Sequence, residues 1–149
     1  MASTYSNLLY HFVFSTKNRI PIITGIEKNV HRYLSSNIAQ MGGRVFSVNG
    51  TADHIHIVAK LLPRHRVSDV LKMIKGNSSN LVNESGKCDI HFEWQVGYGA
   101  FSVSKSKLND TIRYIVNQKE HHRRKTFKEE LIELLDAHEI EYDERYLWD

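Results

Sequence analysis

The sequence predicts a single α+β domain of the ferredoxin-like or RRM-like kind, a split β-α-β fold with helices on one face of an antiparallel sheet and a further C-terminal helix. Three observations predict it. Apolar periodicity gives the element order β-α-β-β-α-β-α before a last helix. Hydrophobic residues make up 41% and charged residues 25% of 149 positions, as in one globular domain. No apolar run approaches the ~18 residues of a membrane span.

The chain begins with a strand and a helix. In residues 5–15 the side chains alternate between two faces, as in a strand buried on at least one side. One face of this strand carries aromatic side chains, namely Tyr10, Phe12 and Phe14. Thr24 and Glu27 then match a capping box, and residues 26–41 repeat apolar side chains with helical spacing. We expect this helix to end at the glycine pair 42–43.

A strand with two histidines follows as half of a hairpin. Residues 44–48 and 53–61 flank an Asn-Gly turn signal at 49–50. Alternation puts His54 and His56 on one face of the second strand, roughly 6.5–7 Å apart and close enough to bind one ion. Taken alone, such a pair is more often solvent-facing or hydrogen-bonded. A metal site therefore needs partner residues elsewhere in the chain.

The rest of the chain adds three helices and one strand. The expected elements are a helix at 67–82, a loop at 83–89, a strand at 94–103, a helix at 107–122 and a helix opened by the capping box Thr126/Glu129. Gly97 and Gly99 interrupt the strand, where we expect a bulge or a close backbone approach. An acidic and aromatic tail, residues 142–148, ends the chain.

Charge is divided unevenly along this domain, residues 1–149. Residues 1–128 contain 19 Lys and Arg against 8 Asp and Glu, whereas residues 129–149 contain 1 against 9. The basic body favours a polyanionic partner, most often nucleic acid. Residues 126–149 form an acidic C-terminal helix and tail that can shield part of the basic surface.

Two further features bear on the compartment. A single cysteine, Cys88, excludes an internal disulfide and fits a reducing environment. Residues 1–5 lack the basic start and apolar stretch of a signal peptide. We therefore expect a cytoplasmic protein with no membrane partner.

The helix at 107–122 carries polar side chains opposite its apolar stripe. The stripe consists of Leu108, Ile112, Ile115 and Val116. At ~100° per residue, Tyr114, Gln118 and His121 fall on the other side, with Tyr114 and Gln118 one turn apart. A tyrosine used only for core packing is expected on the stripe. Taken singly, each of these residues is also common on ordinary helix surfaces.

Together, Asp53-His54-Ile55-His56 and the later Tyr114-x-x-x-Gln118 resemble the single-tyrosine HUH transposases of bacterial insertion sequences. The resemblance runs from the first strand to about His122. It implies that His54, His56 and Gln118 are metal ligands and that Tyr114 is the nucleophile. Imidazoles alone favour zinc, nickel or copper, whereas the resemblance implies Mg²⁺ or Mn²⁺.

The resemblance also implies a reaction and partners. The protein would be a metal-dependent strand transferase that cleaves and rejoins single-stranded DNA at element ends through a 5′-phosphotyrosine, with no small-molecule cofactor. It would recognise hairpins and act as a homodimer, with the tyrosine helix serving its own or its partner's histidines. Basic residues would contact the DNA backbone, namely Lys60, Arg64, Arg66, Lys72, Lys75, Lys105, Lys107, Arg113, Arg123, Arg124 and Lys125.

Other functions remain open at this level. A non-catalytic module of the same fold would bind RNA or another single strand through Tyr10, Phe12 and Phe14 on an open sheet face. A domesticated relative that processes chromosomal repeats would use the same catalytic residues. A structural metal protein is disfavoured, because no further cysteine or histidine lies at the usual ligand spacing.

Overall fold

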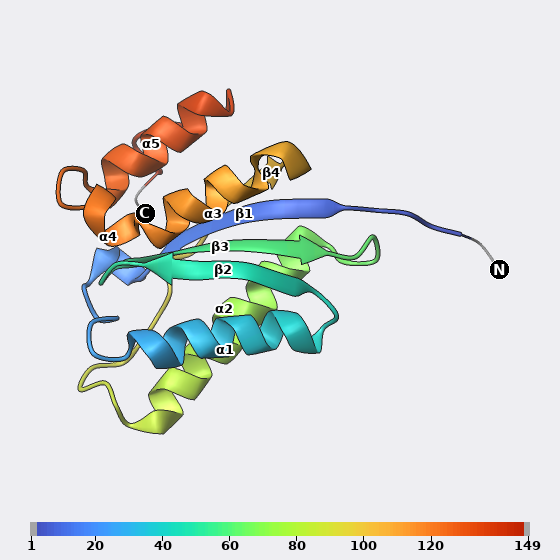
Figure 1. Ribbon diagram of the computed structural model, residues 1–149. Helices are drawn as coiled ribbons and strands as arrows, with labels where there is room; N and C mark the ends of the chain where they lie inside the picture. The colour runs from blue at the N-terminus through green and yellow to red at the C-terminus, as the bar shows by residue number, and fades with distance from the viewer. Residues whose placement is uncertain (1–2, 148–149) are drawn as a thin grey trace.

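The structure, a computed structural model, describes residues 3–147, so Trp148 of the predicted aromatic tail and the first two residues lie outside the described part. Four antiparallel strands form one sheet in the order β2-β3-β1-β4 (Figure 1). The strands are β1 (Leu8–Ser15), β2 (Arg44–Gly50), β3 (His54–Leu61) and β4 (Gly99–Val103). The helices are α1 (Glu27–Gln40), α2 (Val67–Ser85), α3 (Leu108–Val116), α4 (Gln118–His121) and α5 (Phe127–Ala137). This architecture confirms the predicted α+β fold class.

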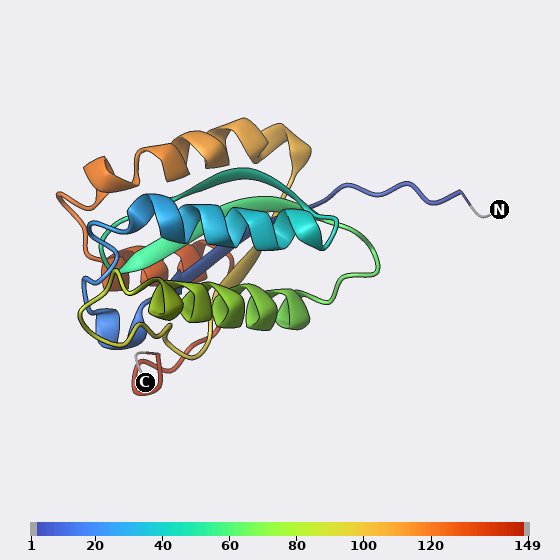
Figure 2. The same ribbon diagram turned by 90° about the horizontal axis from the view of Figure 1, so that it is seen from below.

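One face of the sheet is covered by α1 and α2, which cross it side by side (Figures 1 and 2). Ile55 and Ile57 of β3 point into this layer, where they meet Phe12 and Phe14 of β1. All four side chains are at most 2% exposed. Tyr10 packs at the edge of the same core. These aromatic side chains are therefore core residues, and the hypothesis of an open sheet face that stacks on bases is wrong.

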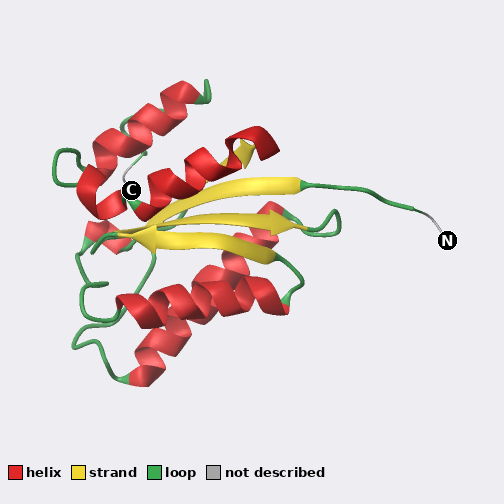
Figure 3. Ribbon diagram, in the orientation of Figure 1, coloured by secondary structure: helices red, strands yellow, loops and turns green. Residues whose placement is uncertain are grey.

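The opposite face is also covered, by α3, α4 and α5 (Figure 3). Val58 of β3 packs against Leu108 and Ile115 of α3, while Phe127 of α5 belongs to a cluster with Val13 of β1. The prediction that helices cover one face of the sheet is therefore wrong, because α1 and α2 cover one face and α3, α4 and α5 cover the other. Because this second face carries buried valines as well as the histidines, it too must be shielded from water.

The helix predicted at 107–122 is two helices with a break at Asn117, whose φ and ψ are −92° and 17°. Asn49 of β2 donates its side-chain amide to the carbonyls of Ile115 and Val116 at 2.9 and 3.0 Å. A continuous helix would use these carbonyls for its own next turn. Val116, the last residue of α3, is predicted to lie in the apolar stripe but is 59% exposed.

Other element ends differ in detail from the prediction. The capping box at Thr126 is confirmed, because its hydroxyl accepts from the Glu129 amide at 3.2 Å. The one at Thr24 is wrong, since α1 begins after Ile26 without a side-chain cap. The strand predicted at 94–103 is shorter in the structure and comprises only β4 (Gly99–Val103), because Gly97 with φ +93° turns the chain out of the sheet. Within residues 3–147, no helix has both the length and the apolar character to cross a bilayer.

Candidate active site

The two histidines of β3 point to the face covered by α3, α4 and α5, and neither has any solvent exposure. Nδ1 of His54 lies 2.8 Å from Oδ1 of Asp53 and 2.9 Å from the Thr51 hydroxyl. Nδ1 of His56 lies 2.7 Å from Nε2 of His11 on β1. With both Nδ1 atoms held by neighbours, the Nε2 atoms are oriented toward one point, as in metal sites with orienting partners.

A single carboxylate, Glu130 of α5, occupies that point and is 1% exposed. Its Oε1 lies 2.8 Å from Nε2 of His56, 3.0 Å from Nε2 of His122 and 3.4 Å from Nε2 of His54. One atom of each of these four residues lies within 4.8 Å of the others. Three imidazole nitrogens and a carboxylate oxygen at such separations are a donor set that fits one divalent ion.

The other oxygen of Glu130 faces the residues predicted on the tyrosine helix. Oε2 accepts hydrogen bonds from the Tyr114 hydroxyl and, at 2.9 Å, from Nε2 of Gln118. The amide oxygen of Gln118 lies 3.1 Å from Nε2 of His54, and Gln118 is fully buried. The structure therefore brings together all four residues predicted for the site, and it does so within one chain.

Tyr114 is half-buried at the end of α3, with its ring 5.9 Å from the His56 ring and stacked on His121 at 4.8 Å. It also lines a cavity of about 520 Å³ between α3, α5 and the sheet. Phe101 and Leu134 form apolar walls of this cavity, and Lys107 contributes a positive charge. The cavity gives a ligand from solvent a path to the tyrosine.

Burial and hydrogen bonding act in opposite directions on the two histidines. Burial lowers the pKa of His56 to about 4. Burial alone would lower the pKa of His54 too, but hydrogen bonds with Asp53 and Glu130 outweigh it and raise the pKa to about 9. For His11, burial lowers the pKa to about 3, and the neighbouring His56 adds to this effect. In the metal-free site, His54 is therefore positively charged at neutral pH, whereas His56 and His11 are neutral.

Burial and hydrogen bonding also shift the pKa values of Glu130 and Tyr114, in opposite directions for Glu130 and in the same direction for Tyr114. Burial alone would raise the pKa of Glu130, but hydrogen bonds from His122, His54 and His56 outweigh it and keep the carboxyl ionised. Burial raises the pKa of Tyr114, and the hydrogen bond to Glu130 raises it further. The tyrosine is therefore a neutral phenol in the metal-free site and must lose its proton during any attack that it makes.

These shifts predict that metal-free protein is most stable near pH 6.5. Below that pH, His11 and His56 bind protons in the unfolded state but stay neutral when buried in the folded state. Stability therefore falls on acidification. Stability contributed by His54 is complete below its unfolded pKa of 6.5 and is lost as pH rises toward 9. We expect the free energy of unfolding, measured by urea denaturation, to fall on both sides of pH 6.5. The fall should be about 3 kcal/mol on the alkaline side and larger on the acid side, where two histidines titrate.

Asp53→Asn is the matched control for the alkaline arm, because it removes the carboxylate that binds Nδ1 of His54. In this variant the decline between pH 6.5 and 9 should flatten. A wild-type free energy of unfolding that stays constant over that interval would contradict the assignment of a protonated His54.

The structure does not gather all the predicted basic residues around the tyrosine. Lys60, Arg64 and Arg66 lie at or beyond the end of β3 that is farther from His54. Lys75 lies on the α1/α2 side, where its ammonium donates to backbone carbonyls at 2.7 and 2.6 Å. Lys72 is on the same helix.

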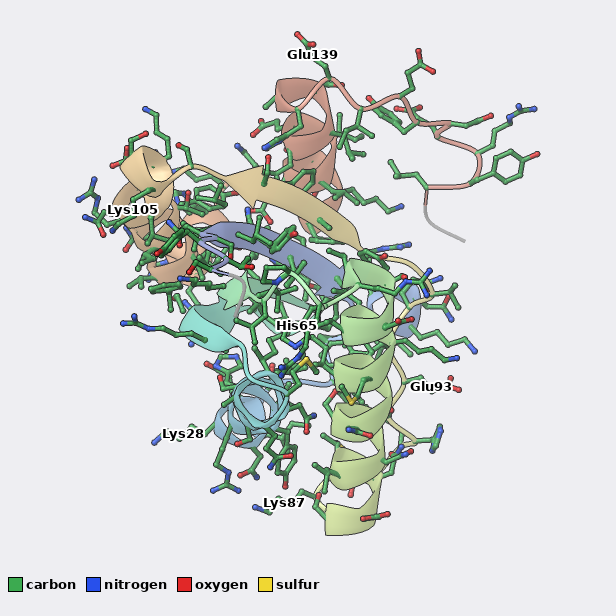
Figure 4. All side chains as sticks on the ribbon, turned by 90° about the vertical axis from the view of Figure 1, so that its right-hand side faces the viewer. Lys28, His65, Lys87, Glu93, Lys105 and Glu139 are labelled. Carbon is green, nitrogen blue, oxygen red and sulfur yellow. The ribbon has the colours of Figure 1, made fainter. Side chains whose placement is uncertain are left out.

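Basic residues that lie on the same side of the sheet as Tyr114 are those of the second half of the chain. Figure 4 shows Lys105 on the α3/α5 side, opposite Lys28 and Lys87. Arg113 and Arg123 form ion pairs with acidic residues one turn earlier in the chain, and Lys125 pairs with Glu133. Contact with nucleic acid stays a prediction for these residues, namely Lys105, Lys107, Arg113, Arg123, Arg124 and Lys125, and also for Lys60, Arg64 and Arg66, which lie elsewhere on the surface.

Sequence reasoning missed Glu130, His122 and His11. His122 follows Gln118 by four residues, so helical spacing already placed both on one face. Glu130 lies three residues after Phe127 and four before Leu134, in the apolar stripe of α5. A carboxylate in an apolar stripe was the signal that α5 contributes to the site. His11 gave no comparable signal, because its partner lies on another strand.

Comparison with known proteins is consistent with this geometry. The family model described as "Transposase IS200 like" matches residues 4–118. The transposase for insertion sequence element IS200 of Salmonella typhimurium is 28% identical over 123 residues, which cover 76% of this chain and 80% of the relative. The IS200 transposase of Salmonella typhi matches with the same identity and coverage.

Two solved structures share the fold. A protein of Deinococcus radiodurans R1 superposes with a TM-score of 0.63 at 21% identity, over 79% of this chain and 95% of that one. A REP-associated tyrosine transposase bound to a REP hairpin gives a TM-score of 0.62 at 13% identity, over 82% of this chain and 73% of that one.

Proposed function

This chain belongs to the family of IS200-like transposases, and we propose that it cleaves and rejoins single-stranded DNA through a covalent 5′-phosphotyrosine at Tyr114. The observation that carries the proposal is the position of the Tyr114 hydroxyl, which a buried carboxylate holds beside two buried histidines. Membership of the family makes the chain a DNA-processing enzyme of transposition. The side chains of the site would supply the nucleophile and the metal-binding atoms that such chemistry requires.

In the proposed reaction, Oη of Tyr114 attacks the scissile phosphorus. The new bond between Oη and phosphorus forms as the bond from phosphorus to the 3′ oxygen breaks. The phenol proton, which is hydrogen-bonded to Oε2 of Glu130, is released to solvent, and the departing 3′ oxygen takes a proton from solvent. Because one phosphodiester replaces another, a second 3′ hydroxyl can reverse the attack and join a strand without ATP.

His54, His56 and Gln118 would hold a divalent metal, with Mg²⁺ or Mn²⁺ expected. A bound divalent ion supplies Lewis-acid polarisation of the scissile phosphate. The surrounding side chains prepare the ligands for it: Asp53 fixes the ring of His54, and the contact with His11 fixes the ring of His56.

The proposed partner is single-stranded DNA with a hairpin. A hairpin is the ligand named for one solved transposase of the same fold. The cavity beside Tyr114 would admit the strand to be cut, and Lys107 at its wall would attract a phosphate. Tyr114 lies beside the histidines of its own chain, which favours assembly in cis. A homodimer that exchanged α3 and α4 between subunits would preserve the same contacts.

The test is incubation with a single-stranded hairpin DNA and Mg²⁺ or Mn²⁺, followed by denaturing electrophoresis. A 3′ label should migrate with the protein, whereas a 5′ label should appear in a free fragment, because the tyrosine keeps the 5′ phosphate of the break. EDTA should abolish both products. An adduct that carries the 5′ label, or cleavage that leaves no adduct, would contradict the proposal.

A further inference from the structure

The predicted metal ligands, two imidazoles and an amide, supply no negative charge to a divalent ion. Mg²⁺ and Mn²⁺ prefer carboxylate, carbonyl and water oxygens, whereas two imidazoles favour zinc, nickel or copper. Gln118 offers one neutral oxygen, 3.1 Å from Nε2 of His54. Two neutral rings and an amide would leave the double charge of the ion uncompensated in a site where both histidines have no solvent exposure.

Glu130 provides the missing charge at the right place. Its Oε1 lies 2.8 Å from Nε2 of His56 and 3.4 Å from Nε2 of His54. Adjacent ligands of an octahedral ion with bonds of about 2.1 Å lie about 3.0 Å from one another, since the two bonds meet at a right angle. These separations therefore match the edges of a coordination shell, and small shifts of the side chains would accommodate an ion.

The two oxygens of Glu130 have separate partners, which allows two simultaneous roles. Oε1 faces the imidazole nitrogens, while Oε2 accepts from Tyr114 and from Gln118. A carboxylate that binds an ion through Oε1 can keep Tyr114 in place through Oε2. Glu130 lies on α5, beyond the segment 4–118 that matches the family, so no role for it follows from that match.

We infer that Glu130 is a direct ligand of the divalent metal, together with His54 and His56, and that α5 is thereby part of the metal site. This inference rests on the metal assistance proposed above. The competing possibility is that Glu130 merely fills the space of the ion and leaves when a metal binds. The two possibilities predict opposite effects of Glu130 on metal affinity. A ligand increases the affinity, whereas a side chain that the metal must displace reduces it.

The test measures binding of Mn²⁺ to the full chain without DNA, by titration calorimetry and electron paramagnetic resonance. Glu130→Gln preserves the shape of the side chain and removes its charge, so the dissociation constant should rise at least about 10- to 100-fold. Glu133→Gln is the matched control, since Glu133 is an exposed carboxylate of the same helix, paired with Lys125. Its affinity should equal that of wild type. Unchanged or tighter binding by Glu130→Gln would overturn the inference.

A second measurement on the wild-type chain does not depend on how the variant folds. Diamagnetic Mg²⁺ should shift the nuclear magnetic resonance signal of the Glu130 side-chain carboxyl carbon together with the imidazole nitrogen signals of His54 and His56. A shift of the imidazole signals without one of the Glu130 carboxyl would overturn the inference. Failure of the DNA reaction is scored separately, by the absence of the covalent adduct in wild-type protein with bound metal.

Discussion

Tyr114→Phe is expected to abolish the covalent protein–DNA adduct. Phenylalanine keeps the ring contacts with His56 and His121 but has no oxygen that can attack phosphorus. The rate of adduct formation should fall by at least about 10⁴-fold, the size of effect seen when an enzyme loses its nucleophile. Glu130 keeps its hydrogen bond from Gln118, so the free energy of unfolding should change by no more than about 3 kcal/mol.

The adduct is measured with 3′-labelled hairpin DNA on a denaturing gel, and DNA binding is measured by fluorescence anisotropy. Tyr10→Phe is the matched control, because it removes a hydroxyl from a half-buried tyrosine on the other face of the sheet. It should cleave DNA at the wild-type rate. An adduct that persists in Tyr114→Phe would refute Tyr114 as the nucleophile.

His56→Ala is expected to remove metal binding and to slow cleavage on the order of 10³-fold, because Lewis-acid assistance contributes several kcal/mol to the barrier. The variant loses the donor nearest to Glu130 and the contact with His11. Binding of hairpin DNA should be largely preserved, since His56 is fully buried and touches no solvent-facing surface. Cleavage is followed by single-turnover kinetics at saturating Mg²⁺.

His65→Ala is the matched control for this experiment. His65 follows β3, on the α1 side of the sheet, and makes hydrogen bonds to the Leu62 amide and the Met41 carbonyl at 2.9 and 2.8 Å (Figure 4). Its replacement should cost stability without affecting cleavage of the protein that remains folded. If His56→Ala instead loses DNA binding together with cleavage, the pair of histidines on β3 has a structural role.

Several features of the site follow from patterns that are local in the sequence. The alternation of side chains along a strand puts His54 and His56 on one face whatever packs above them. The spacing of four residues brings Tyr114 and Gln118 to one side. They stay there although Asn117 breaks the helix between them, because hydrogen bonds of helical spacing, from the Asn117 amide to the Arg113 carbonyl and from the His121 amide to the Asn117 carbonyl, continue through the break. The capping box at Thr126 likewise depends only on neighbouring residues.

Three other features depend on contacts between distant segments. Asn49 of β2 ends α3 by binding its last carbonyls, across 66 residues of chain. His11 reaches His56 only because β1 pairs with β3 in the observed register. Helices cover the histidine face because the apolar stripes of α3 and α5 pack against Val58 and Val13 on that face. The stripes themselves do not specify which apolar surface they will cover.

The sequence by itself therefore determined the fold class, the shared face of the two histidines and the pairing of Tyr114 with Gln118, because strand alternation and helix spacing are properties of the local backbone. Only the tertiary structure decided that Glu130 lies at the centre of the site. Its position results from the packing of α5 against β1 and β4, through Phe127 and Leu135. The sequence of an amphipathic helix shows that one of its faces will be buried. Which surface buries that face depends on the tertiary structure of the rest of the chain.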